Sequence, residues 1–120
     1  MAKILAVDDS VSMRQMVTFT LKSAGHEVVE AADGQEALDK ARGGKVDLVV
    51  TDVNMPRMDG ITLVKELRKL PDYRFTPILV LTTESAGDKK MAGKQAGATG
   101  WIVKPFSPEQ FLNTINRVLG

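Results

Sequence analysis

Short apolar segments that alternate with helical patterns are the feature that most constrains the fold of this chain. Four of the five segments are rich in Val and Ile and lack strict polar alternation, which is typical of strands buried on both faces of a sheet. The second segment is brief and flanked by Glu27 and Glu30, as an edge strand would be. The segments are Ile4–Val7, Glu27–Val29, Leu48–Val50, Ile78–Leu81 and Trp101–Val103.

Helical patterns separate these segments and follow the last one. Ser10 or Ser12 can cap the first helix and Gly25 can end it, while Ser107 can cap the last. The fourth helix is intrinsically poor, because each of its internal glycines, Gly87 and Gly93, costs about 1 kcal/mol relative to Ala. The expected helices cover Met13–Ala24, Gln35–Ala41, Ile61–Leu70, Ser85–Ala96 and Pro108–Leu119.

The β-α unit therefore repeats five times, which predicts an α/β fold. We expect a (βα)5, doubly wound parallel five-stranded sheet with helices on both faces and right-handed crossovers. A length of 120 residues suits one domain, which we place at residues 1–120.

Composition excludes several functional classes. The chain has no Cys and one His, His26, which excludes disulfides, thiolate catalysis and Cys-ligated metal centres. Its net charge of +1 argues against nucleic-acid or anionic-membrane binding. No apolar run approaches ~18 residues, and the N-terminus lacks the shape of a signal peptide. We therefore expect a cytoplasmic protein without membrane insertion and without a nucleic-acid partner.

Polar residues follow four of the predicted strands. Asp8 and Asp9 come after the first strand, Asp52 after the third, Thr82 after the fourth and Lys104 after the fifth. Because the carboxyl ends of parallel strands share one edge, where open α/β sheets bind ligands, we expect these side chains to meet there.

Each of these residues also has a structural interpretation. Asp8 or Asp9 alone could cap a helix, but two adjacent acids cannot both do so, and Asp52 adds to their repulsion. A hard divalent cation, Mg²⁺ above all, would relieve it. Lys104 is either a counter-charge at this site or a surface lysine. Thr82 either donates to a phosphoryl oxygen, caps the next helix or satisfies backbone groups.

The segment from Asp52 to Gly60 is rich in turn residues. We interpret Pro56 and Gly60 as loop residues, and Asp59 as a helix N-cap without chemistry. Asn54 could offer its backbone carbonyl to a metal or its amide to water.

Four motifs together make the chain resemble the response-regulator receiver domains of two-component signalling, in particular the stand-alone receivers of chemotaxis. The resemblance covers the whole chain and implies the flavodoxin-like strand order 2-1-3-4-5. The motifs are VDDS at Val7–Ser10, TDVNMPRMDG at Thr51–Gly60, LTTES at Leu81–Ser85 and AGATGWIVKPF at Ala96–Phe106.

The resemblance implies a role for each site residue. Asp52 matches the phosphoacceptor, Asp9 the direct Mg²⁺ ligand and Asp8 the acid that holds metal-bound water. The backbone carbonyl of Asn54 matches a further metal ligand. The remaining matches are Thr82 with the hydroxyl that moves toward the phosphoryl group, Lys104 with the lysine on a phosphoryl oxygen, and Trp101 with the switch aromatic.

Two residues of this chain differ from those usual in the family. Trp101 is larger than the usual Tyr or Phe, and Thr83 replaces a frequent Ala or Gly, which narrows access to the phosphoryl group. The resemblance also implies a cis Lys104–Pro105 peptide.

The implied function is signalling, with catalysis limited to the chain's own phosphorylation and dephosphorylation. The implied partners are a histidine kinase of the chemotaxis type, a downstream target such as the flagellar motor switch, and a phosphatase. We expect a monomer without an output domain that signals through the fourth helix, fifth strand and fifth helix, with Lys89, Lys90, Lys94 and Trp101 on that surface. The lysines also suit a solvated helix face.

Other functions fit the sequence less well. A stand-alone receiver could act as a phosphate sink or regulate a non-flagellar target, and a pseudo-receiver would normally lack one acid or the lysine. An aspartyl-phosphate hydrolase would carry Asp-x-Asp rather than Asp8-Asp9 and usually a cap domain. A flavodoxin-like nucleotide carrier would need a phosphate loop free of acids after the first strand.

Overall fold

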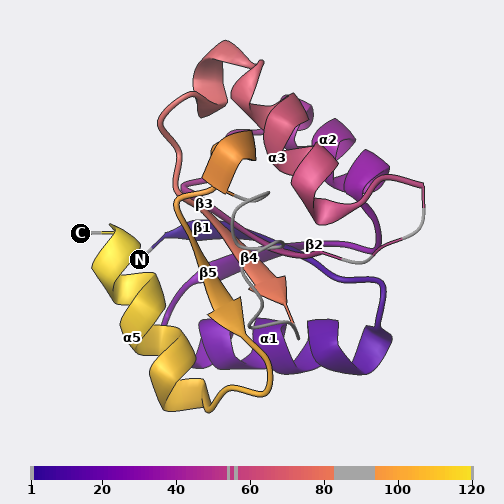
Figure 1. The fold of residues 1–120 in the computed structure, drawn as a ribbon. Coiled ribbons are helices and arrows are strands. Elements are labelled where there is room, and N and C mark those ends of the chain that lie inside the picture. Colours follow the sequence, from indigo (N-terminus) through magenta and orange to yellow (C-terminus); the bar gives the residue numbers. More distant parts are fainter. Residues whose placement is uncertain (1, 54, 56, 83–93, 120) are drawn as a thin grey trace.

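The computed structural model describes residues 2–53, 55, 57–82 and 94–119. Five parallel strands form one sheet in the order β2-β1-β3-β4-β5 (Figure 1). This confirms the predicted fold class and places the second segment at an edge. The strands are β1 (Lys3–Val7), β2 (Glu27–Ala31), β3 (Leu48–Asp52), β4 (Ile78–Thr82) and β5 (Gly100–Val103).

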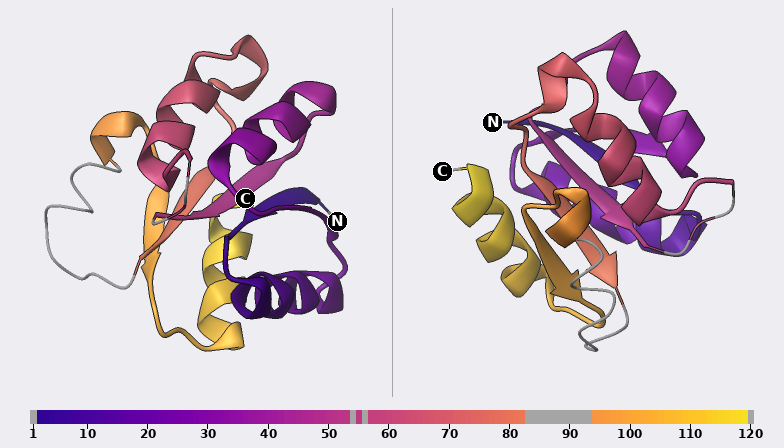
Figure 2. Two further views of the ribbon diagram at one scale, coloured as in Figure 1. Left: turned by 90° about the vertical axis from the view of Figure 1, so that its right-hand side faces the viewer. Right: turned by 45° about the horizontal axis from the view of Figure 1, so that its top comes forward.

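Helices cover both faces of the sheet. Figure 1 shows α2 and α3 on one face and α1 and α5 on the other, and the two views of Figure 2 agree. Residues 94–96 are helical just before β5, and the rest of the expected helix Ser85–Ala96 lies outside the described residues. The bounds are α1 (Val11–Ser23), α2 (Gly34–Gly43), α3 (Gly60–Arg68), the 3₁₀ helix η1 (Pro71–Tyr73) and α5 (Pro108–Leu119).

Local capping residues define where these helices begin. The Ser10 side chain accepts a hydrogen bond from the backbone N–H of Met13, so α1 is capped by the serine and by neither preceding aspartate. Ser107 Oγ accepts from the N–H of Gln110 at 3.1 Å at the start of α5. Ser10 leaves Asp8 and Asp9 available for another role.

Two apolar cores lie on opposite faces of the sheet. Leu5, Val49 and Val80 point from the sheet toward α2 and α3, whereas Ile4 and Val50 point toward α1 and α5. Strand residues thus alternate between two buried faces, which explains the continuous apolar runs. Complete burial of each such side chain stabilises the fold by about 1.5–3 kcal/mol relative to exposure.

Element ends differ from the sequence-based prediction in ways that matter for the site. β3 and β4 extend through Asp52 and Thr82, so both residues end their strands instead of following them. α3 ends at Arg68, before the predicted Leu70, because the residue before Pro71 is extended (ψ 127°).

None of the helices described is long and apolar enough to cross a bilayer.

Candidate functional site

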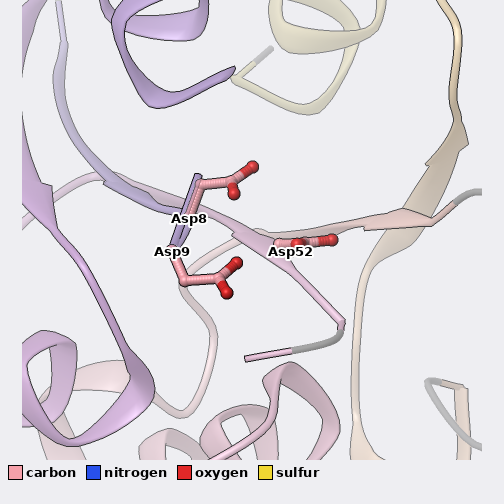
Figure 3. A group of neighbouring side chains, drawn as sticks. All are labelled: Asp8, Asp9 and Asp52. Carbon is pink, nitrogen blue, oxygen red and sulfur yellow. The ribbon is translucent and has the colours of Figure 1, made fainter. Parts of the chain in front are cut away.

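Three carboxylates converge at the carboxyl edge of the sheet. Asp8 and Asp9 follow β1, and Asp52 ends the neighbouring strand β3 (Figure 3). Each side chain offers one oxygen, and these oxygens all lie within 4.8 Å of one another. Asp8 is buried and Asp9 is exposed, so the cluster opens to solvent on one side. The structure thus brings together the acids that the sequence predicted to meet.

Lys104 reaches the same cluster from the end of β5. Its Nζ lies 3.1 Å from Oδ1 of Asp52 and 3.6 Å from Oδ2 of Asp8, and its side chain is 12% exposed. The backbone N–H of Lys104 donates to the carbonyl of Thr82 at 2.7 Å, which joins it to the end of β4. The Lys104–Pro105 peptide is cis, as expected. The interpretation of Lys104 as a counter-charge therefore fits better than that of a surface lysine.

Burial is the largest influence on the pKa of Asp8. Burial raises the pKa of its carboxyl above the ordinary value, and the charges of Asp52 and Asp9 act in the same direction. The backbone N–H of Ser10, which donates to Oδ1 at 2.9 Å, and the Lys104 ammonium lower this pKa. The site therefore disfavours the ionised form of the Asp8 carboxyl group, and additional positive charge nearby would favour it.

The donor set fits a hard divalent cation. Oδ2 of Asp8 is buried and accepts no hydrogen bond from any residue that the structure describes. Three carboxylates against one ammonium leave two negative charges uncompensated in the cluster. Carboxylate oxygens that converge in this way are the ligands Mg²⁺ prefers. Asp8, Asp9 and Asp52 could therefore hold the ion.

Thr82 and Trp101 lie on the two strands nearest Lys104. Thr82 is 4% exposed at the end of β4 and is paired in register with Val103. Trp101 is 39% exposed on the edge strand β5, opposite Val80 of β4. The predicted hydroxyl group thus lies at the same edge as the acids, while the predicted switch residue lies on a partly exposed edge of the sheet.

Other residues that the sequence analysis singled out do not belong to this cluster in the described part of the chain. Asn54 and Thr83 lie outside the described residues, as do Lys89 and Lys90. Asp59 is the N-cap of α3, because its Oδ1 accepts from the backbone N–H of Thr62 at 2.7 Å, so it has the predicted structural role.

The start of α3 packs directly on the end of β3. A Cβ at Gly60 would collide with the backbone carbonyl of Asp52, and the Gly60 N–H donates to the Val53 carbonyl at 2.8 Å. Only glycine permits this close approach. The backbone at Asp52 is thus held in place by the helix that follows it.

Sequence reasoning missed two basic residues, Arg14 beside Asp8 and Arg57 in the chain after β3. Arg14 donates to the backbone carbonyl of Asp8 at 2.7 Å and pairs with Glu30 at 3.2 Å. Arg57 donates to the side chain of Asp33. Arg14 lies about one helical turn after Ser10, the last residue of the VDDS motif, and this closeness to the motif could have indicated its contact with Asp8. Nothing in the sequence near Arg57 indicates its contact with Asp33.

The sequence of the chain matches a known family. The model of the response regulator receiver domain matches residues 4–116. The chain is 40% identical to a chemotaxis protein CheY homolog of Campylobacter jejuni, over 98% of this chain and 92% of the relative. It is 39% identical to the alkaline phosphatase synthesis transcriptional regulatory protein PhoP of Bacillus subtilis, over 98% of this chain, and spans about half (48%) of that relative.

Solved structures agree with these sequence matches. Chemotaxis response regulator CheY4 of Vibrio cholerae has a TM-score of 0.95 and 58% identity, with 98% of each chain covered. The receiver domain of the sensor histidine kinase PA1611 of Pseudomonas aeruginosa, described with a magnesium ion in its active site cleft, has a TM-score of 0.93 and 28% identity, covering 99% of this chain and 98% of that one. The chain belongs to the response regulator receiver domain family of two-component signalling, and it is similar to the CheY chemotaxis proteins.

Proposed function

We propose that Asp52 accepts a phosphoryl group from the phosphohistidine of a histidine kinase. The observation that supports this most is the position of the Asp52 carboxylate, which clusters with Asp8 and Asp9 and lies 3.1 Å from the Lys104 ammonium. The ammonium group can neutralise charge on an incoming phosphoryl group, and the neighbouring acids can hold a cation that does the same.

In the proposed reaction, a carboxylate oxygen of Asp52 forms a bond to phosphorus as the phosphorus–nitrogen bond of the donor breaks. The imidazole leaves with the electron pair of that bond. Lys104 neutralises charge on a phosphoryl oxygen, and the Thr82 hydroxyl donates to another. Water later attacks the acyl phosphate, which returns the Asp52 carboxylate and inorganic phosphate.

Asp8, Asp9 and Asp52, together with the backbone carbonyl of Asn54, would hold Mg²⁺. When bound, the ion supplies positive charge that offsets repulsion between the acids and the phosphoryl donor. The acidic cluster supports this assignment, as does the magnesium ion described for the PA1611 receiver domain.

We further propose that the chain acts as a single receiver domain that signals through its surface. The near-complete coverage of the Campylobacter homolog and the Vibrio CheY4 structure supports this. The names of these relatives describe chemotaxis proteins, which favours a chemotaxis kinase as donor. We propose a target such as the flagellar motor switch on the family resemblance alone. Thr82 and Trp101 would couple the site to the exposed face of β5.

Intact-mass spectrometry tests the phosphoacceptor. Acetyl phosphate with Mg²⁺ should add one phosphoryl group to the wild type and none to Asp52→Asn. An unmodified wild type, or a variant modified at the same rate, would contradict the assignment.

A pull-down with beryllofluoride-loaded protein tests the target. Recovery of a motor-switch protein supports the chemotaxis role. Recovery of a different target, or of none, would overturn it in favour of a non-flagellar regulator or a phosphate sink.

A further inference from the structure

An ion pair joins the chain after β3 to the chain after β2. Arg57, in the segment that links β3 to α3, donates from Nη2 to Oδ2 of Asp33, which lies two residues beyond the end of β2. The Asp33 side chain is 9% exposed, whereas that of Arg57 is 66% exposed. We call this Arg57–Asp33 pair the clasp.

Both oxygens of Asp33 are engaged, so its carboxylate is held in one orientation. Oδ1 accepts from the backbone N–H of Glu36 at 2.8 Å as the N-cap of α2, while Oδ2 accepts from Arg57. Glu36 in turn accepts from the N–H of Ala32 at 2.9 Å, which adds a second side-chain contact at the start of the helix. The hydrogen bond from Arg57 holds the pKa of Asp33 below its ordinary value.

A second contact lies beside the clasp. A Cβ at Gly34 would lie 2.6 Å from the carbonyl oxygen of Met58, so the backbone at Met58 rests directly on the first turn of α2. Arg57 and Met58 therefore both dock on the start of this helix.

The backbone at Arg57 needs this support. Its φ of 66° lies in the left-handed region, and it is the only non-glycine residue with positive φ in the described part of the chain. Residues with a Cβ disfavour this region, so a contact elsewhere must hold the conformation. The clasp is such a contact.

The position of the clasp relates it to the three acids. The strand that precedes Asp8 and Asp9 lies between β2 and β3 in the sheet. The N–H of Asp8 donates to the carbonyl of Ala31 at 3.1 Å, which ties the end of β2 to the acidic pair. The clasp ties the same end of β2 to the chain that follows Asp52. The pairing of Val7 with Thr51 already holds the end of β1 beside the end of β3, and the clasp adds a second tie that opposes separation of the mutually repelling acids.

We propose that Arg57 and Asp33 are positioning residues that set the spacing between Asp52 and the Asp8–Asp9 pair, and thereby the affinity of the cluster for Mg²⁺. The inference rests on the proposed function for its biological meaning. It concerns the metal affinity of the cluster, which is measured without any phosphodonor.

The test compares variants that remove the ion pair but keep the fold. Asp33→Asn preserves the N-cap, since Asn caps helices as well as Asp. Arg57→Gln removes the charge on the other side, and the double variant removes both. Lys69→Gln is the matched control, because it breaks a close ion pair with Glu66 on α3, whose lysine is 72% exposed. Titration calorimetry with Mg²⁺ alone measures affinity, and thermal unfolding checks the fold.

Each single variant should lose about 3- to 10-fold in Mg²⁺ affinity, and the double variant should lose no more than either. Arg57→Lys should recover part of the loss, and Lys69→Gln should bind as the wild type does. Wild-type affinity in both single variants, or additive losses in the double variant, would overturn the clasp.

A backbone test adds a second readout. Arg57→Gly and Arg57→Ala both remove the guanidinium, but Gly adopts positive φ without strain. Arg57→Gly should therefore retain higher Mg²⁺ affinity than Arg57→Ala, and equal affinities would contradict the positioning role. If acetyl phosphate fails to modify the wild type, the proposed function is overturned. The positioning role of the clasp is judged separately, from the Mg²⁺ affinities alone.

Discussion

The ammonium group of Lys104 lies 3.1 Å from the carboxylate of Asp52, although 52 residues separate them in the chain. The contact exists because parallel strands β3, β4 and β5 lie side by side and end at the same edge. Asp52, the candidate phosphoacceptor, therefore forms a partly buried ion pair with Lys104, and the same lysine also lies near Asp8.

Asp52→Asn should stabilise the protein in chelator. The change removes repulsion with Asp8 and Asp9, and Lys104 keeps Asp8 as a partner. We expect the free energy of unfolding to rise by about 1–3 kcal/mol. Urea unfolding with EDTA measures it. A lower midpoint than that of the wild type would contradict a repulsive three-acid cluster.

Lys104→Met should have the opposite effect without metal. It leaves Asp8 and Asp52 without their ammonium partner in a largely buried site, which should cost about 2–4 kcal/mol. Added Mg²⁺ should then raise the thermal midpoint by more than it does in the wild type. Equal gains in the two proteins would show that lysine and metal do not compensate the same charge.

Mg²⁺ binding should depend more on Asp9 than on Asp8. The resemblance assigns Asp9 direct ligation and Asp8 a contact through water, and Lys104 already offsets part of the Asp8 charge at 3.6 Å. Calorimetry with Mg²⁺ should therefore give a larger loss of affinity for Asp9→Ala than for Asp8→Ala. Equal losses would argue against this division of roles.

Trp101 is the only tryptophan and so reports on its own environment. It is 39% exposed, and Thr82 lies on the adjacent strand. Beryllofluoride with Mg²⁺ should change its emission if it exchanges between outward and inward positions. Thr82→Ala should remove most of that change and still permit phosphorylation. Identical emission in the free, metal-bound and beryllofluoride-bound protein would leave Trp101 as a fixed packing residue.

The stability of the protein at acidic pH should depend on the clasp. Because the hydrogen bond from Arg57 lowers the pKa of Asp33, the unfolded chain takes up this proton first as the pH falls. The stabilisation is present above the unfolded value of about 3.9 and is lost as the pH falls through the lower folded pKa. Urea midpoints measured across this window should fall less steeply for Asp33→Asn than for the wild type. Parallel curves would mean that the ion pair is absent in solution.

Features that depend on neighbouring residues were predictable from the sequence. Short apolar runs located all five strands. The caps Ser10, Asp59 and Ser107 were recognisable because a cap bonds a backbone group only three residues away. The parallel order of the sheet then implied that the acids would share an edge. Strand ends were less predictable, because pairing with a neighbour carries β3 through Asp52 and β4 through Thr82.

The sequence by itself determined the α/β class, the acidic cluster and, through its motifs, the family. Only the tertiary structure decided which of those residues touch. Whether Lys104 meets Asp52 depends on the register of strands that are distant in sequence. The Arg57–Asp33 contact likewise depends on β2 and β3 flanking β1 and on a left-handed backbone at a residue that disfavours it. Such contacts leave no periodic or local signal, because they form between loops whose approach is set by the packing of the whole sheet.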